Sequence, residues 1–600
     1  MYTFYKKHEY LLAILFVLIT QLIVLPEVGK YPDTDNYTHA RRILDLIESR
    51  NWAETPYMHT NYPFGEILHF TRITDVFWLF FSLPAFLFFP VKDAVYWGGY
   101  IYQTGILALS AAALIWALKP LAPAILRFIG LCLLFVQPSI TETYILNKPD
   151  HHVLTAFFAF TLTGSLLHYV DDKQMKYLRI AGISAGLGLW ASIEGLLISY
   201  ALLAGMILLF LIGKESIKAC TVYCSYYFFS SFICLIVNPP YEGFFFPDNG
   251  RLSFLLVTVI SFTTGAMFLL YFCEEKKLLN GFVRKICALT GTAVFFIALL
   301  FLFFPPDIIF APYFPPIIKE IWADDVVELQ SVLKKPVLFF LGGWPSILSL
   351  LTGLAIFKFC TPKQRSFLIL TLFPLIFLVS LSSISIRYSR LSSLFTPFSF
   401  VLAFSLRTKK LVLSERKKSI LLALLYVCTT IYLGANYISV NRIMASFWPS
   451  VSIVKPYLPQ GEGSILADTF LGPDIVWTLN EKVIGSPYHR NVEGITDGVL
   501  MLHSKNQAVA LDLLKKHRVK AILIYFEIPD LPYLFYNTKQ QYSFFNTTQK
   551  KDTLFLQLLY RKGIPCGISE ELNTPPPFIL YNVDFSKCSG EQNNEATEKN

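Results

Sequence analysis

The sequence predicts a polytopic α-helical membrane protein, with about thirteen transmembrane helices, that carries a C-terminal soluble α/β domain. Hydrophobic residues make up 54% of the 600-residue chain, which includes 54 Phe, and the mean hydropathy is +0.50. Apolar runs near the ~20 residues that span a bilayer recur from residue 10 to residue 438. After them, short apolar strands alternate with helical stretches. We therefore expect a transmembrane domain over 1–438 and an extracytoplasmic α/β domain over 439–600.

The first apolar run follows Lys6 and Lys7, which places the N-terminus in the cytoplasm. No small-residue cleavage site follows this run, so we expect a retained span, not a signal peptide. Residues 31–75 then lie outside. The runs cover 10–27, 76–90, 95–118, 122–138, 152–170, 178–194, 196–213, 219–237, 253–273, 284–304, 336–358, 366–382, 391–405 and 419–438.

Charged residues in the loops set the expected topology. Basic residues gather in alternate loops, as the positive-inside rule requires of cytoplasmic loops; these are 171–176, 214–218, 274–277, 363–365 and 407–418. The loops between them, and the whole tail, are then extracytoplasmic. An even number of spans must separate residue 75 from residue 150, yet three apolar runs lie there. One of the three is expected to be interfacial or a broken half-helix, and 76–90 is the shortest and contains Pro84.

The same clustering explains the net charge of +9. Basic residues that lie in short loops between apolar runs indicate membrane topology and not a nucleic-acid partner.

Of the 10 cysteines, only Cys566 and Cys588 belong to the tail. An oxidising compartment could pair them, and free thiols are the alternative.

The tail pattern predicts strands near 464–467, 482–485 and 520–525, with a helix over 506–516. The polar end, 591–600, is expected to be disordered.

Two acidic motifs at the ends of apolar segments carry the functional argument. The first is Asp33-Thr34-Asp35. Asp35 is expected to cap a helix that places His39 and Arg42 on its own face. A solvated helix N-terminus is the alternative interpretation.

The second motif, Asp150-His151-His152, precedes a span. Its carboxylate and imidazoles form a mixed oxygen and nitrogen ligand set that suits Mn²⁺ or Mg²⁺ when combined with further carboxylates. Because the topology places both motifs on one side, we expect a divalent-cation site between them. Glu194 and Glu328, at predicted outer positions, are candidates to complete it.

Arg387 and Arg390 lie at a predicted outer membrane face, where the positive-inside bias makes cations unexpected. A lipid phosphate would explain them, and a salt bridge to a carboxylate is the alternative.

These motifs resemble those of the GT-C membrane glycosyltransferases, and among them the catalytic subunit of oligosaccharyltransferase in its archaeal form. Asp35-x-x-x-His39-x-Arg41 is similar to the first acidic motif of the family, and Asp150-His151-His152 to the second. Val326-Val327-Glu328 occupies the loop where the family carries Ser-Val-Ser-Glu. Arg387 is similar to the arginine that contacts the donor phosphate. Thirteen spans before an outer soluble domain is also the layout of the family.

The sequence departs from the family in its tail. The Trp-Trp-Asp-x-Gly signature, which reads an Asn-x-Ser/Thr acceptor, is missing. In its place stand 467–473 and Pro487-Tyr488-His489-Arg490-Asn491, which with Glu194 resemble a bacterial branch of GT-C-like proteins. Asparagine as acceptor is therefore poorly supported.

The resemblance implies a glycosyltransferase of the bacterial inner membrane with a periplasmic tail. It would transfer, with inversion, a sugar from a polyprenyl-(pyro)phosphate donor to a glycan, lipid or protein acceptor. The expected catalytic carboxylates are Asp33, Asp35 and Glu328; Mn²⁺ or Mg²⁺ would be held by Asp35, Asp150 and His152; the donor phosphate would be held by Arg387 and Arg390; further pocket residues would be His39, Arg41, His151, Glu194, His489 and Arg490. The alternatives are an asparagine-linking oligosaccharyltransferase with an altered acceptor pocket and, in a different class, a transporter of lipid-linked glycans.

Overall fold

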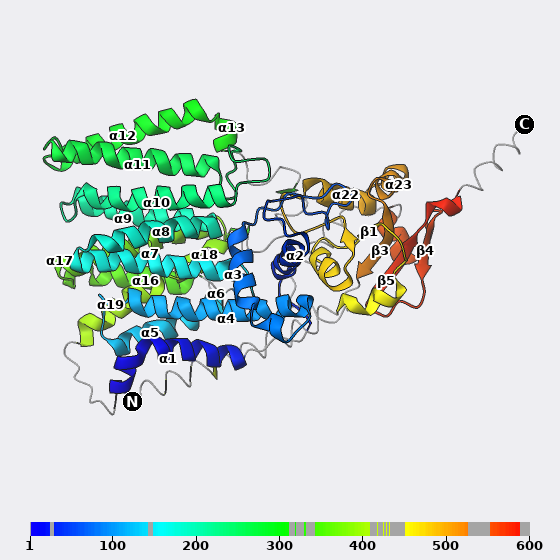
Figure 1. The fold of residues 1–600 in the computed structure, drawn as a ribbon, viewed down its shortest axis with the longest axis horizontal. Helices are drawn as coiled ribbons and strands as arrows, with labels where there is room; N and C mark the ends of the chain where they lie inside the picture. The colour runs from blue at the N-terminus through cyan, green and yellow to red at the C-terminus, as the bar shows by residue number, and fades with distance from the viewer. Residues whose placement is uncertain are drawn as a thin grey trace, which may run out of the picture.

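The computed structural model has two parts, a bundle of long helices and a smaller α/β part formed by the tail (Figure 1). It describes residues 2–23, 29–141, 144, 148–310, 318–319, 329–331, 343–408, 417, 424, 428, 431–432, 450–525 and 553–588. The predicted boundary at 438–439 lies outside these residues, as does the predicted disordered end.

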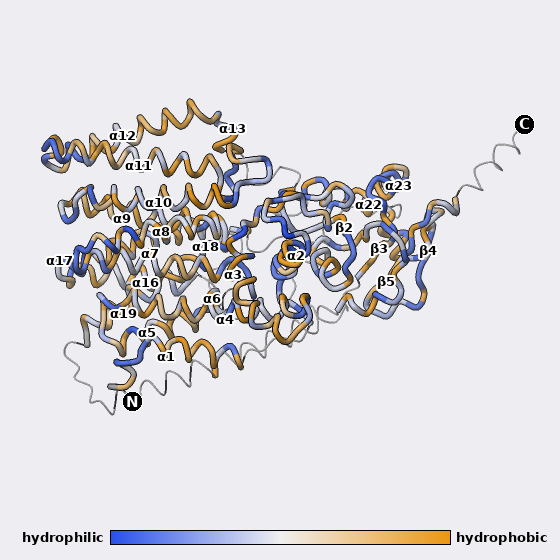
Figure 2. Tube along the Cα trace, viewed as in Figure 1, coloured by the Kyte–Doolittle hydropathy of each residue, from blue (hydrophilic) through white to orange (hydrophobic). Residues whose placement is uncertain are grey.

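The bundle helices follow the apolar runs. Among the described residues, eight helices are long and apolar enough to cross a membrane, with α18 and α19 taken together as one. Figure 2 shows apolar residues along the whole bundle, whereas the tail is mixed. The helices of the bundle are α1 (Tyr2–Ile23), α4 (Val91–Ala117), α5 (Ala124–Phe135), α6 (Pro138–Ile140), α7 (His152–Asp172), α8 (Met175–Ala191), α9 (Glu194–Leu211), α10 (Ile217–Val237), α11 (Phe254–Glu275), α12 (Phe282–Phe303), α16 (Trp344–Ile356), α17 (Pro362–Ser382), α18 (Arg387–Ser393) and α19 (Thr396–Thr408).

The three runs before residue 150 form one full span and two shorter elements. Run 95–118 lies in α4, which has 27 residues. Run 76–90 forms α3 (Arg72–Ser82), of 11 residues, and the 3₁₀ helix η1 (Ala85–Leu87). Helix α3 lies at the end of the bundle, between the long helices and α2 (Thr34–Ser49) (Figure 1). Run 122–138 forms α5, of 12 residues. Most of run 419–438 is outside the described residues, so the count of thirteen stays a prediction.

The two predicted sides of the membrane correspond to the two ends of the bundle. Three predicted cytoplasmic loops meet through Lys363, which pairs with Asp171 at 2.5 Å, and through Lys173, which pairs with Glu215. At the other end, Trp190 Nε1 donates to Asn238 Oδ1 at 3.2 Å. The loops thus alternate between the two ends as the charge pattern predicts.

Small residues let the bundle helices approach closely. A Cβ on Gly182 of α8 would lie 2.5 Å from the carbonyl oxygen of Tyr223 in α10. Gly186, one turn later, would place its Cβ 2.0 Å from Ser230 Oγ. Close backbone approach through small residues is typical of helix packing in lipid.

The tail forms a five-stranded sheet of order β2-β1-β3-β5-β4. Strand β1 (Ser464–Leu466) pairs in parallel with β2 (Lys482–Val483) and β3 (Val519–Tyr525), at the predicted positions. Strands β4 (Ile568–Glu571) and β5 (Phe578–Val583) add an antiparallel edge that the sequence pattern did not predict.

The predicted helix in the tail is α23 (Gln507–Lys516), capped by Asn506. It is accompanied by α22 (Val492–His503) and α25 (Leu554–Tyr560). Cys566 and Cys588 form a disulfide, which decides between the two alternatives left by the sequence. Short helical turns complete the tail: η6 (Val451–Tyr457), α21 (Gly472–Asp474), η7 (Ile475–Leu479) and η8 (Phe585–Cys588).

The tail is anchored in the bundle by an aromatic residue. Trp477, in η7, packs into the same hydrophobic core as the bundle helices and is 5% exposed. Its ring lies 5.8 Å from that of Tyr31, and its carbonyl oxygen accepts a 2.6 Å hydrogen bond from Lys92 Nζ. The segment before α3 also packs against the tail, because Tyr57, Leu68 and Phe70 share a core with it. The tail is therefore held against the end of the bundle where α2 begins.

Candidate functional site

Helix α2 begins at the first acidic motif. Asp33, and not Asp35, occupies the N-cap position, with the extended backbone that a cap requires. The predicted capping role of Asp35 is therefore wrong: it lies in the first helical turn, where its charge suits the positive end of the helix dipole. Asp33 makes no capping hydrogen bond and instead pairs with Lys148 at 3.3 Å.

The two acidic motifs meet in space. Asn36 Nδ2 donates a 3.0 Å hydrogen bond to the carbonyl oxygen of Pro149, which links α2 to the second motif across 113 positions of sequence. Burial raises the pKa of Asp150 well above its ordinary value, and the negative charges of Asp35 and Asp33 raise it further. Carboxylates whose charges act on one another in this way favour the uptake of a proton or a cation.

Asp150 is held rigidly at the start of α7. Its Oδ1 accepts a 2.5 Å hydrogen bond from the His152 backbone N–H. Its own carbonyl oxygen accepts one of 2.8 Å from the hydroxyl of Tyr102 in α4. The carboxylate is 3% exposed, so its position depends on these contacts and not on solvent.

Three histidines lie beside these carboxylates. The ring of His151 lies 4.3 Å from that of His152 and 6.0 Å from that of His39 in α2. His152 Nδ1 faces Glu194 Oε2 at 3.8 Å. These two buried atoms have no hydrogen-bond partner in the part of the chain that the structure describes. Each therefore keeps a lone pair or a proton available to a ligand.

Glu194 also binds the arginine predicted to hold phosphate. Arg387 Nε and Nη2 donate to Glu194 Oε1 at 3.1 and 2.9 Å. This is the salt bridge that the sequence left as the alternative for Arg387. Arg390 lies one turn further along α18, and its positive charge acts on Asp150 and His151. The positive charges of both arginines thus act on the second acidic motif.

The tail brings a third group to this place. The Tyr488 hydroxyl donates a 2.7 Å hydrogen bond to Thr38 Oγ1 in α2, and its ring packs on Phe70. The ring of His489 lies 5.0 Å from that of His69. Burial lowers the pKa of His489 to about 3, and the charges of Arg490 and Arg387 contribute. His489 is therefore neutral near pH 7.

Two predicted site residues are not part of this group. Arg41 points toward Asp45, Glu48 and Asn480 and contacts them at 2.8 to 3.1 Å. Glu328 lies outside the described residues. Within the described ranges no three His, Cys, Asp or Glu side chains are grouped closely enough to hold a metal ion. The described residues thus do not form a complete set of ligands for the predicted cation.

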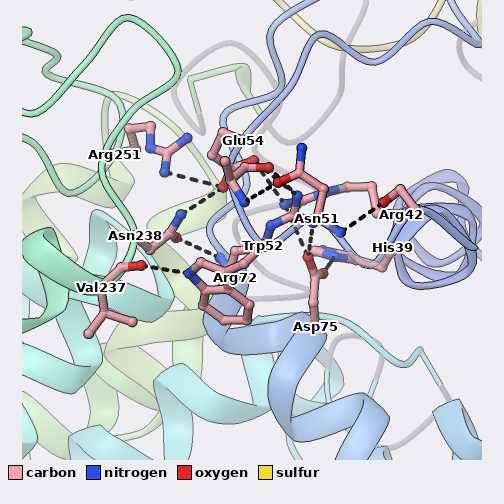
Figure 3. Close-up of polar contacts among 12 residues, drawn as sticks. His39, Arg42, Asn51, Trp52, Glu54, Arg72, Asp75, Val237, Asn238 and Arg251 are labelled. Carbon is pink, nitrogen blue, oxygen red and sulfur yellow. Dashed lines mark hydrogen bonds and ion pairs between the residues drawn. The ribbon is translucent and has the colours of Figure 1, made fainter. Parts of the chain in front are cut away.

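A buried charged network, which sequence reasoning missed, adjoins the site at His39 (Figure 3). Asp75, at the start of α3, pairs with Arg42 at 3.1 Å and with Arg72 at 3.1 Å, and lies 3.6 Å from His39. Burial alone would raise the pKa of Asp75, but Arg42, His39 and Arg72 lower it to about 2. The network continues through Glu54 to Arg251, in the loop after α10. The only signal in the sequence was the placement of Arg42, Arg72 and Asp75 in one predicted outer loop.

Comparison with known proteins reveals structural relatives. No family model and no curated protein sequence matches this chain. A solved structure of the archaeal oligosaccharyltransferase AglB from Archaeoglobus fulgidus, with an inhibitory peptide and a dolichol-phosphate, superimposes with a TM-score of 0.65. The two sequences are 16% identical, and the match covers 87% of this chain and 70% of AglB. The apo form of the A. fulgidus enzyme gives a TM-score of 0.63 at 17% identity, over 87% and 70% of the two chains.

A third structure, of the same enzyme with zinc and sulfate, gives a TM-score of 0.59 at 17% identity, over 85% of this chain and 68% of that one. These likenesses concern the fold, because sequence identity this low does not carry an activity. The chain therefore has the fold of an archaeal oligosaccharyltransferase, a GT-C fold, as its motifs predicted.

Proposed function

We propose that this protein is a membrane glycosyltransferase that transfers a sugar or oligosaccharide from a polyprenyl-(pyro)phosphate donor on the periplasmic face of a bacterial inner membrane. The observation that carries the proposal is the hydrogen bond from Asn36 to Pro149, which brings the two acidic motifs together. The oligosaccharyltransferase-like fold supports the same reaction class, since AglB was solved with a dolichol-phosphate.

The residues present are of the kind that a divalent cation requires. Asp35 and Asp150 offer hard carboxylate oxygens, and the buried Nδ1 of His152 has no hydrogen-bond partner among the described residues. We assign Mn²⁺ or Mg²⁺ to these three ligands, with Glu328 as a further ligand. When bound, the ion would neutralise charge on the leaving phosphate.

The chain's own residues would orient the two substrates. Arg387 and Arg390 would hold the donor phosphate by charge-assisted hydrogen bonds. Glu194 would pair with the Arg387 guanidinium until the donor phosphate displaces it. Asp33 or Asp35 would accept the proton of the acceptor nucleophile as general base. Attack on the face opposite the leaving phosphate gives inversion.

The neutral His489, beside His69, and Arg490, which pairs with Asp248, would line the acceptor side, because Tyr488 holds this part of the tail against α2. The second candidate function is an oligosaccharyltransferase that uses asparagine as acceptor. The similarity of fold favours it, and the missing Trp-Trp-Asp-x-Gly signature opposes it.

A transporter would need charges in the middle of its spans. Here Glu194 and Arg387 each begin a helix and Asp150 precedes one.

Mass spectrometry of the donor tests this proposal. Purified protein is incubated with lipid-linked glycans extracted from bacterial membranes and with candidate peptide, lipid and glycan acceptors. The proposal requires release of the polyprenyl (pyro)phosphate with transfer of the glycan. Intact donor under all acceptors, with folded protein and added Mn²⁺, would contradict it.

A further inference from the structure

The buried network that adjoins the site holds more positive than negative charge. Arg42, Arg72 and Arg251 are 4%, 6% and 2% exposed. They face two carboxylates, Asp75 and Glu54. The adjoining ion pair between Arg490 and Asp248 adds one charge of each sign, so one positive charge is left over. His39 does not change this sum, because burial lowers its pKa and leaves it neutral near pH 7. An unbalanced buried charge is costly unless a counter-ion binds it.

The arginines also have unused donors. In the described part of the chain, no hydrogen-bond partner exists for Arg42 Nη1, for Arg72 Nε, or for Nε and Nη1 of Arg251. A guanidinium group presents its N–H donors in a planar fork that matches the oxygens of a carboxylate, phosphate or sulfate. These unpaired N–H groups are therefore suited to bind an oxyanion.

Glu54 satisfies these arginines poorly. Its Oε2 lies 3.6 Å from Arg42 Nη2 and 3.9 Å from Arg72 Nη2, and its Oε1 lies 3.5 Å from Arg251 Nη2. Charge-assisted hydrogen bonds are shorter, at about 2.7–2.9 Å. Its short contact is with a neutral group, Asn238 Nδ2, at 2.9 Å. One carboxylate is therefore shared among three guanidinium groups.

The elements around Glu54 show how the site is built. Arg42 comes from α2, Arg72 from α3 and Arg251 from the loop between α10 and α11 (Figure 3). The backbone N–H of Arg72 donates a 2.8 Å hydrogen bond to Asn238 Oδ1, and its guanidinium group donates to the Asp75 carboxylate. The guanidinium groups are thus oriented before any ligand binds.

We propose that Arg42, Arg72 and Arg251 form a binding site for one oxyanion beside Glu54, separate from the donor-phosphate site assigned to Arg387. The ligand is a carboxylate, phosphate or sulfate group, either as a free ion or as part of an acidic sugar. The site does not depend on the proposed transferase activity, because three segments of the chain create it without Asp35 or Asp150.

Calorimetry on the full-length protein in detergent tests the site. The probes are inorganic phosphate, sulfate and D-glucuronate, with chloride and D-glucose as controls at constant ionic strength. Arg251→Gln should weaken oxyanion binding about tenfold or more, since it removes a charged hydrogen-bond donor. Arg387→Gln should leave this binding event in place, and the exposed Arg561→Gln should change nothing. Binding of phosphate or sulfate alone indicates a free ion, and binding of glucuronate indicates an acidic sugar.

Glu54→Gln is the second variant, and its expected effect is a gain. Removing the competing negative charge should tighten oxyanion binding several-fold, which a damaged fold cannot imitate. Oxyanion binding that is unchanged in Arg251→Gln, or no tighter in Glu54→Gln, would overturn the proposal, as would binding of chloride in place of the oxyanions. If Arg251→Gln does not fold, Glu54→Gln decides the question.

Discussion

Asn36 and Pro149 are joined by a hydrogen bond of 3.0 Å, from the side-chain amide of one to the backbone carbonyl of the other. Asn36 follows the first acidic motif directly, and Pro149 directly precedes the second. Because Asn36 is fully buried, solvent cannot replace this contact. This buried amide, together with the more exposed ion pair between Asp33 and Lys148, thus sets the relative position of the two motifs.

Replacing Asn36 by Ala should separate the motifs. It leaves the buried Pro149 carbonyl without its donor, at a cost of about 1–3 kcal/mol in the free energy of unfolding. The maximal rate of glycan transfer should fall strongly while the melting temperature changes little. Small displacements of catalytic carboxylates slow the reaction even when the helix bundle remains packed. The exposed Asn573→Ala is the matched control. An Asn36→Ala variant with unchanged transfer rate would show that this bond does not align the site.

Arg387→Ala should raise the KM for the lipid-linked donor about tenfold or more, since a charged hydrogen bond contributes about 1.5–3 kcal/mol. Glu194→Gln separates this role from that of the salt bridge. If Arg387 holds phosphate, Glu194→Gln leaves or lowers the donor KM, because a competing carboxylate is gone. Equal increases of KM in both variants would mean that the arginine serves only the salt bridge.

Glu66 should make stability depend on pH. Burial raises its pKa from 4.5 to about 7, although hydrogen bonds from Thr60 and Ser486 oppose the shift. The folded protein therefore holds this proton where the unfolded chain has lost it. The stabilisation is complete below pH ~4.5 and is lost as the pH rises through about 7, by on the order of 3 kcal/mol.

Thermal unfolding between pH 4.5 and 8 measures this dependence. Glu66→Gln, which cannot ionise, should flatten the curve, whereas the exposed Glu242→Gln should leave it unchanged. A Glu66→Gln curve parallel to that of the wild type would disprove the role of Glu66.

Reduction of the Cys566–Cys588 disulfide should loosen the antiparallel edge of the tail sheet. The bond closes a loop of 22 positions around β4 and β5. Loop-closure entropy then predicts a loss of about 3 kcal/mol from the stability of the tail. Hydrogen exchange of β4 and β5 in reducing buffer measures it. Exchange that is equal in oxidised and reduced protein would contradict the prediction.

Much of the fold follows from local patterns in the sequence. Apolar length predicts helices such as α7 and α11, and alternating charge predicts which loops share an end, as Lys363 and Asp171 do. Strands β4 and β5 were missed because no strand was predicted after the one near 520–525. The capping role was given to Asp35 because both aspartates suit that position by chemistry, and only the backbone distinguishes them.

The candidate site was predictable only in part. Motif residues such as Asp150 could be predicted from their residue type and their position at the start of a span. The network of Arg42, Glu54 and Arg251 was not predictable, since the predicted topology places the loop after α10 and the first outer loop on one side without pairing their residues. Long-range pairing of this kind is set by helix packing.

Glycan transfer in the presence and absence of metal is the most direct test of the central claim, that the two acidic motifs form one catalytic site. Transfer is measured with EDTA and then with Mn²⁺ restored, for the wild type, Asp35→Asn and Asp150→Asn. The wild type should lose activity in EDTA and regain it with Mn²⁺, and each variant should be slower by on the order of 100- to 1000-fold in Mn²⁺ while remaining folded. Full activity in EDTA, or in either folded variant, would contradict the account.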